Sequence, residues 1–122
     1  SMCILEEMQW KRTRYITSAD FFHGTLELVE PGVPVFLFMG EDENRKLDER
    51  VRAFLTRGVT GDTDINVIDT AEFAIPGLDD EFRVIVSPWI LSSLITDRLA
   101  AYYETVTKHN LKYRRYYHQF DY

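Results

Sequence analysis

The hydrophobic and polar positions along the chain predict alternating strands and helices in its central part. Residues 33–39, VPVFLFM, are a nearly continuous apolar run, which is typical of a strand buried on both faces of a parallel sheet. A helical repeat of apolar residues comes next, and the short run INVID at 65–69 predicts a second strand. The repeat consists of Leu47, Val51, Phe54 and Leu55. A strand–helix–strand unit over residues 33–69 normally pairs its strands in parallel through a right-handed crossover.

Further helices are predicted on both sides of this unit. Residues 3–13 carry apolar side chains at helical spacing, and Glu7 flanks their apolar face. Ser87-Pro88 is typical of the first residues of a helix, and helical spacing continues over 87–108. A tail rich in Tyr, Arg and Lys follows at 109–122. Because sheets of this class usually have about five or six strands, we expect an α/β fold of the three-layer αβα type with a parallel sheet, present here as a truncated portion.

Charge and composition limit the classes of partner. The chain has 122 residues, 45% of them hydrophobic, which suffices for the core of one domain at most. Its net charge of -6 argues against nucleic acid, which requires a basic face. The uninterrupted apolar runs are too short to cross a bilayer, so no membrane partner is expected. The single Cys3 fits a reducing cytoplasm, and we interpret Ser1 and Met2 as a tag remnant on a segment of a longer protein.

Glu7 and His23 are the candidate chemical groups, within LEEMQWKRTRYITSADFFHGTLELVE. A carboxylate base and an imidazole can together open a sugar ring and move a proton between adjacent carbons. Taken alone, Glu7 is more simply a solvated helix acid, and His23 a loop histidine bonded to a backbone carbonyl. The three histidines and one cysteine show no ligand spacing, so no metal site is expected.

Several short motifs resemble sugar isomerase (SIS) domains in order and spacing. They are MQW after the glutamate, ADFFHGTLE, PVFLFMGEDENR and the RRYY ending. The closest resemblance is to the fructosamine-6-phosphate deglycases, of the fructoselysine and fructose-asparagine type, and to the C-terminal part of their second SIS domain. Thr25 stands where that family often has proline.

The resemblance implies a function and a set of roles. It implies hydrolysis of an Amadori product, a fructosamine 6-phosphate, to glucose 6-phosphate and a free amino acid, without metal or organic cofactor. Glu7 would be the base, and His23 would assist ring opening in the active site of a neighbouring subunit of a homodimer. The tail residues Arg115 and His118 would bind the phosphosugar substrate, with Arg114 and Tyr116 as further candidates, unless the tail packs only on its own domain. The phosphate-binding Ser/Thr loops of the family are expected upstream of this segment.

Two other functions remain open at this point. The same two residues could isomerise a hexose phosphate, as in the isomerase half of glucosamine-6-phosphate synthase. The chain could also belong to a non-catalytic, sugar-phosphate-binding SIS module.

Overall fold

The computed structural model describes residues 3–121 as two compact units. One unit consists of residues 16–91, and the other combines the residues up to Tyr15 with those from Ser92 onward. Each unit is described here by itself.

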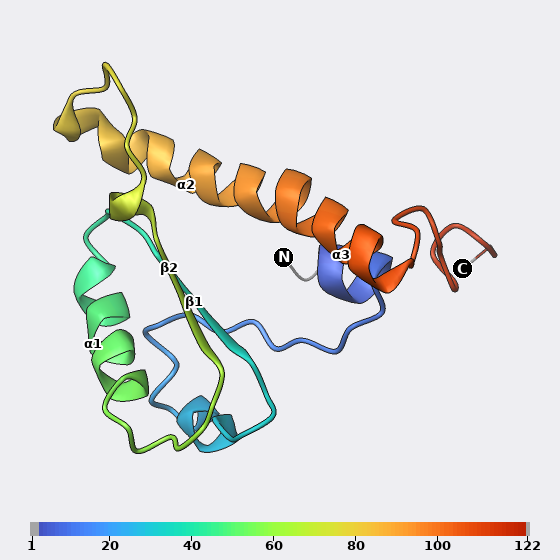
Figure 1. Cartoon of the computed structure of the whole chain (residues 1–122), viewed down its shortest axis with the longest axis horizontal. Coiled ribbons are helices and arrows are strands. Elements are labelled where there is room, and N and C mark those ends of the chain that lie inside the picture. Colours follow the sequence, from blue (N-terminus) through green and yellow to red (C-terminus); the bar gives the residue numbers. More distant parts are fainter. Residues whose placement is uncertain (1–2, 122) are drawn as a thin grey trace. The chain divides into compact units, whose positions relative to one another are not determined.

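A parallel pair of strands forms the centre of the unit 16–91. β1 (Val35–Met39) and β2 (Ile65–Asp69) pair with Val35 opposite Ile65 and Met39 opposite Asp69 (Figure 1). The apolar run and the INVID segment therefore form the two strands that their composition predicts. The parallel direction follows because a helix carries the chain back between them.

The core of this unit lies between β1 and α1 (Arg45–Leu55). Leu37 and Met39 point to the same face of β1, since side chains alternate along a strand. Val51 and Leu55, one turn apart on α1, pack against them. Phe21, from the loop that precedes β1, completes this buried cluster.

Charged residues join the carboxyl ends of the two strands to the helices. Arg45 donates two hydrogen bonds to the carboxylate of Asp69 and a third to the carbonyl of Gly40. Arg83 bonds to Glu41 and to the carbonyls of Thr70 and Phe73. These bonds fix the loops that leave both strands.

The helix after β2 begins earlier than the sequence predicts. A 3-10 turn (Asp80–Phe82) leads directly into α2 (Arg83–Ser93), so Ser87 and Pro88 lie inside the helix and the predicted start at 87 is wrong. Two causes favour the earlier start. Asp80 and Glu81 interact favourably with the amino end of the helix, and Arg83 is held by Glu41.

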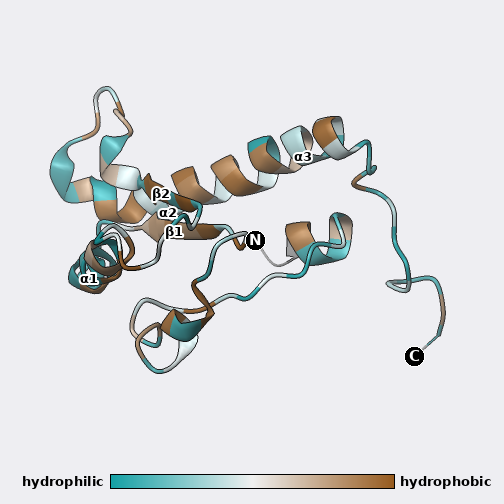
Figure 2. Ribbon diagram, turned by 60° about the horizontal axis from the view of Figure 1, so that its bottom comes forward, coloured by the Kyte–Doolittle hydropathy of each residue, from teal (hydrophilic) through white to brown (hydrophobic). Residues whose placement is uncertain are grey.

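A single helical stretch of 28 residues runs from Asp80 to Thr107. It continues from α2 through a π-helix (Leu94–Leu99) into α3 (Ala100–Thr107). Figure 2 shows hydrophobic residues recurring along it, and by length and composition alone it could cross a membrane. In the sequence the same stretch is divided by polar residues into short apolar runs, and the helix joins these runs. Asp97 and Arg98 lie in its second half, and charges are costly inside a bilayer.

The second unit pairs the first described helix with α3 and the tail. That helix is a π-helix (Cys3–Met8), and the predicted extent of 3–13 is too long. Trp10 turns the chain with a φ of 54°, in the left-handed region that ends helices. The amide of Gln9, which is buried, donates to the carbonyl of His109 and accepts from Thr107, so the π-helix is tied to the end of α3.

Candidate active site around Glu7

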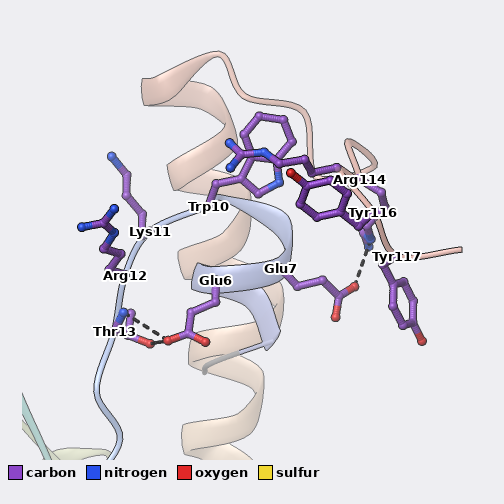
Figure 3. Close-up of a pocket in the computed structure, with 10 residues that line it drawn as sticks. Glu6, Glu7, Trp10, Lys11, Arg12, Thr13, Arg114, Tyr116 and Tyr117 are labelled. Carbon is purple, nitrogen blue, oxygen red and sulfur yellow. Dashed lines mark hydrogen bonds and ion pairs between the residues drawn. The ribbon is translucent and has the colours of Figure 1, made fainter. Parts of the chain in front are cut away.

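Glu6 and Glu7 are neighbours in the π-helix but point to different partners (Figure 3). Glu6 accepts hydrogen bonds from the backbone amide and the hydroxyl of Thr13, which closes the turn after the helix. Glu7 is directed at the tail, and 29% of its side chain is exposed. Glu7 is thus the carboxylate of this pair that is not used to stabilise the turn.

Arg114 of the tail pairs with Glu7. Its Nε lies 3.0 Å from Oε1 of Glu7, and 19% of its side chain is exposed. Its Nη1 donates to the carbonyls of Leu111 and Tyr113, at 2.7 and 2.9 Å. The guanidinium is therefore fixed by its own turn of the tail as well as by the carboxylate, and its direction is preorganised.

Trp10 connects the same helix to the tail at a second point. Its indole ring packs edge-on against His109, with ring centroids 4.3 Å apart, and the guanidinium of Arg115 lies 4.2 Å above it. A cation over an indole face is an attractive arrangement. The residue that reverses the chain after the helix thus also holds the tail beside Glu7.

An open pocket of roughly 650 Å³ lies between the π-helix, the following turn and the tail (Figure 3). Four of its side chains are cationic and two are anionic, which opposes the net negative charge of the whole chain. Its lining is Glu6, Glu7, Trp10, Lys11, Arg12, Thr13, Arg114, Arg115, Tyr116 and Tyr117. Such a local excess of positive charge favours an anionic ligand next to the Glu7 carboxylate.

His23 lies in the other unit, on the turn before the 3-10 helix Thr25–Leu28. Its side chain is exposed, and its backbone amide donates to the carbonyl of Asp20. Gly24 follows with a φ of 124°, a conformation that side chains rarely adopt. The backbone conformation of the turn thus explains why a glycine follows the histidine.

Contacts of two residues that precede His23 anchor its turn to α1. The hydroxyl of Ser18 donates to Asp48, whose other carboxylate oxygen accepts from the amide of Gly40. Phe22 packs edge-on against Phe54, and the guanidinium of Arg50 lies 4.2 Å from the centre of its ring. The imidazole is therefore displayed to solvent on a well-supported turn.

The predicted tail residues have different surroundings. Arg115 lines the pocket beside Glu7, whereas His118 is exposed, packs against Tyr117 and is not among the lining residues. Arg114 and Trp10 complete the surroundings of Glu7, and the sequence indicated Arg114 only as a further candidate of the tail and gave Trp10 no site role. The only sequence signal for them was their presence in motifs that resemble the deglycases. Among residues 3–121, no group of three or more His, Cys, Asp and Glu is placed to hold a metal ion.

Comparisons with known proteins find deglycases among the relatives of this chain. The chain is 32% identical to fructosamine deglycase FrlB of Bacillus subtilis over 119 residues, which are 95% of this chain and 34% of that protein. It is 36% identical to fructoselysine 6-phosphate deglycase of Escherichia coli over 116 residues, which are 93% of this chain and 31% of that protein. A scan against models of protein families finds no match.

A solved structure covers the entire chain. It is a crystal structure described as a phosphosugar isomerase of Bacillus subtilis, with 31% identity and a TM-score of 0.86 over 100% of this chain and 36% of that one. The chain thus spans about a third of the length of the relatives that it matches. The resemblance predicted from the motifs and the α/β fold class predicted from the strand–helix pattern are both confirmed. The chain is homologous to a segment of fructosamine-type deglycases that makes up about one third of their length, and over that segment it has the fold of a phosphosugar isomerase.

Proposed function

We propose that the protein to which this segment belongs is a phosphosugar deglycase. Its substrate would be a fructosamine 6-phosphate, and its products would be glucose 6-phosphate and a free amino acid. The observation that carries this proposal is the partly buried Glu7 carboxylate in the lining of a cationic pocket, in a chain whose relatives include deglycases. Since the relatives are about three times as long, we assign the activity to the whole protein and expect the segment alone to be inactive.

The proposed chemistry is a proton transfer followed by hydrolysis. Glu7 removes a proton from C1, the carbon that bears the amino-acid nitrogen, and the C2 carbonyl oxygen takes up a proton from solvent to give an enaminol. Glu7 returns its proton to C2 while the nitrogen loses its own proton to solvent, which gives an imine between C1 and the nitrogen. Water adds to the imine carbon, the carbon–nitrogen bond breaks, and glucose 6-phosphate and the amino acid are released. One carboxylate that alternately takes and gives a proton serves both transfers.

His23 would open the cyclic form of the sugar before the proton transfer. An imidazole exchanges protons readily near neutral pH, which suits ring opening. The exposed position of His23 on a supported turn is compatible with action on a second copy of the chain, and we therefore propose a homodimer with shared active sites. A cytoplasmic location is proposed separately, on the single Cys3 of the sequence. Replacing His23 with Gln in the full-length protein should slow product release by about 100-fold or more.

The role of Glu7 is tested by Glu7→Gln in the full-length protein. The test measures glucose 6-phosphate formation from a fructosamine 6-phosphate with a coupled dehydrogenase. The amide retains the size of the side chain but cannot accept the C1 proton, so release should fall by about 100- to 10,000-fold, as for the loss of other positioned acid–base groups. Near-normal release by this variant would exclude Glu7 as the base.

Glu6→Gln is the matched control for this experiment. It makes the same chemical change one residue away, on a carboxylate that is already bonded to Thr13. We expect this variant to retain most of its turnover and to lose a little stability in the turn. Equal losses in the two variants would point to damage of the helix rather than to loss of a base.

Hexose-phosphate isomerisation is the alternative function. The solved structure that covers the chain is described as a phosphosugar isomerase, and Glu7 and His23 could perform that reaction by the same transfer. Supplying fructose 6-phosphate and a fructosamine 6-phosphate to the protein in parallel discriminates between the two functions. The deglycase proposal requires turnover of the second substrate at a much higher kcat/KM.

A further inference from the structure

The position of Arg114 indicates which end of the substrate meets the tail. Its guanidinium is 3.0 Å from the carboxylate that we propose as the base. During the reaction that carboxylate must touch the hydrogen on C1. Any substrate group that replaces the Glu7 carboxylate on Arg114 must therefore lie close to C1.

A fructosamine 6-phosphate of an α-amino acid has two acidic groups that could pair with an arginine. The phosphate is on C6, at the far end of the sugar. The α-carboxylate is attached to the carbon next to the nitrogen on C1, only a few bonds of about 1.5 Å from the reacting carbon. Of the two, only the α-carboxylate lies within reach of a guanidinium that touches Glu7.

We propose that Arg114 is the receptor for the α-carboxylate of the amino-acid part of the substrate. This assignment rests on the proposed function. Arginine suits the role because its planar fork matches a carboxylate with two parallel hydrogen bonds. Among the described residues, Nη2 of Arg114 has no hydrogen-bond partner, whereas Nη1 is held by Leu111 and Tyr113. An incoming carboxylate can therefore use Nε and Nη2 without breaking the turn of the tail.

Arrival of the substrate then exchanges one carboxylate for another on Arg114. In the free protein, Oε1 of Glu7 is occupied by Nε of Arg114. The substrate carboxylate takes this position, and the oxygen of Glu7 is released towards C1. A substrate without an adjacent carboxylate leaves Arg114 on Glu7, so the same contact selects the substrate and prepares the base.

The preferred substrates are then fructosamine 6-phosphates linked through the α-nitrogen of an amino acid. Adducts of simple amines, or of a lysine linked through its side-chain nitrogen, do not bring a carboxylate to Arg114. The other tail arginine cannot substitute for it, because Arg115 is held over the ring of Trp10.

Two adducts that differ only in the carboxylate test this proposal in the full-length protein. They are the fructosamine 6-phosphates of glycine and of methylamine, and kcat/KM for glucose 6-phosphate release is measured for each. The wild-type protein should prefer the glycine adduct by roughly 10- to 100-fold, as expected for a charged hydrogen-bonded pair. Arg114→Gln should lower kcat/KM for the glycine adduct by roughly 10- to 100-fold more than for the methylamine adduct, because both adducts lose a pocket charge but only the glycine adduct loses the partner of its carboxylate. Arg114→Lys, which retains the charge, should restore part of the preference.

Lys112→Gln is the control for the loss of one positive charge from the tail. Lys112 is exposed and lies outside the pocket lining, so its variant should retain the preference for the glycine adduct. Equal losses on both adducts in Arg114→Gln, or no preference in the wild-type protein, would overturn the assignment of Arg114 alone. Absence of release from both adducts by the wild-type protein would overturn the proposed function and this assignment with it. Circular dichroism of each variant separates these results from unfolding.

Discussion

Arg45 and Asp69 join the first residue of α1 to the last residue of β2 through two parallel hydrogen bonds. Nη1 lies 2.9 Å from Oδ1 and Nη2 lies 2.7 Å from Oδ2, while Asp69 is only 4% exposed. This ion pair holds the carboxyl ends of β1 and β2 against α1. The turn that contains His23 is anchored to the same helix. The ion pair is therefore a structural element on which the position of His23 depends.

Asp69→Asn should destabilise the fold. The amide cannot satisfy both guanidinium nitrogens, so a partly buried charge loses its partner, at a cost of about 2 to 4 kcal/mol. Urea unfolding measures this loss. Glu49→Gln is the matched control, since Glu49 is the exposed partner of the same arginine at 3.4 Å and should contribute less than about 0.5 kcal/mol. A similar loss in both variants would show that the charge of Arg45, and not its bond to Asp69, stabilises the fold.

Acid should remove the contribution of two carboxylates to stability. Hydrogen bonds from Arg45 lower the pKa of Asp69, and burial offsets this only in part. Burial opposes ionisation of Glu41, but the hydrogen bonds from Arg83 and Thr70 together hold its pKa below the usual value. A carboxyl group whose folded pKa is lowered stabilises the fold above its unfolded pKa, and this stabilisation is lost as the pH falls through the folded pKa.

The free energy of unfolding should therefore fall from about pH 5 to about pH 2. The measurement is a series of urea unfolding curves across this range. The slope should become shallower in Asp69→Asn, because one of the two titrating groups is gone. An unchanged slope in that variant would assign the acid sensitivity to other groups.

Local sequence patterns predicted those parts of the fold that local forces determine. The apolar run of β1, the stripe of Val51 and Leu55 on α1 and the INVID strand each carry their own periodicity, so the parallel pair follows from the chain itself. The start of α2 does not follow from the local sequence pattern. Ser87-Pro88 is a favourable helix start, but the ion pair of Arg83 with Glu41 comes from residues far apart in the sequence and favours an earlier start.

The candidate site also combines features that local motifs predict with contacts between distant residues. Glu7 and His23 could be selected because each lies within a short motif that resembles a known one. The pairing of Glu7 with Arg114 joins the two ends of the chain, and neither spacing nor composition indicates which of two adjacent arginines meets the carboxylate. Only the turn at Leu111, which holds Nη1 of Arg114, determines this choice.

The two tail residues predicted to bind substrate should differ in their effect. Arg115 lines the cationic pocket and is held over Trp10, whereas His118 is exposed outside the lining. Arg115→Gln in the full-length protein should lower kcat/KM about 10-fold for adducts with and without a carboxylate, because it removes a charge that attracts the anionic substrate. His118→Gln should change kcat/KM less than about 2-fold. A larger loss for His118→Gln would place His118 in the substrate site and require the tail to close further.

The apolar face of the helical stretch Asp80–Thr107 should cause the chain alone to self-associate. Trp89 is 74% exposed and Ile85 is 64% exposed, four residues apart on one face of α2. Exposed apolar patches of this kind mark interaction surfaces.

Light scattering should show particles larger than one chain, with a mass that increases with protein concentration. Trp89→Lys should shift the distribution toward single chains, whereas Val59→Lys should not, because Val59 is equally exposed but lies in the loop between α1 and β2. A single-chain mass at every concentration for the unmodified chain would show that the face does not drive association. The same response to both substitutions would show that added charge, rather than this face, determines the extent of association.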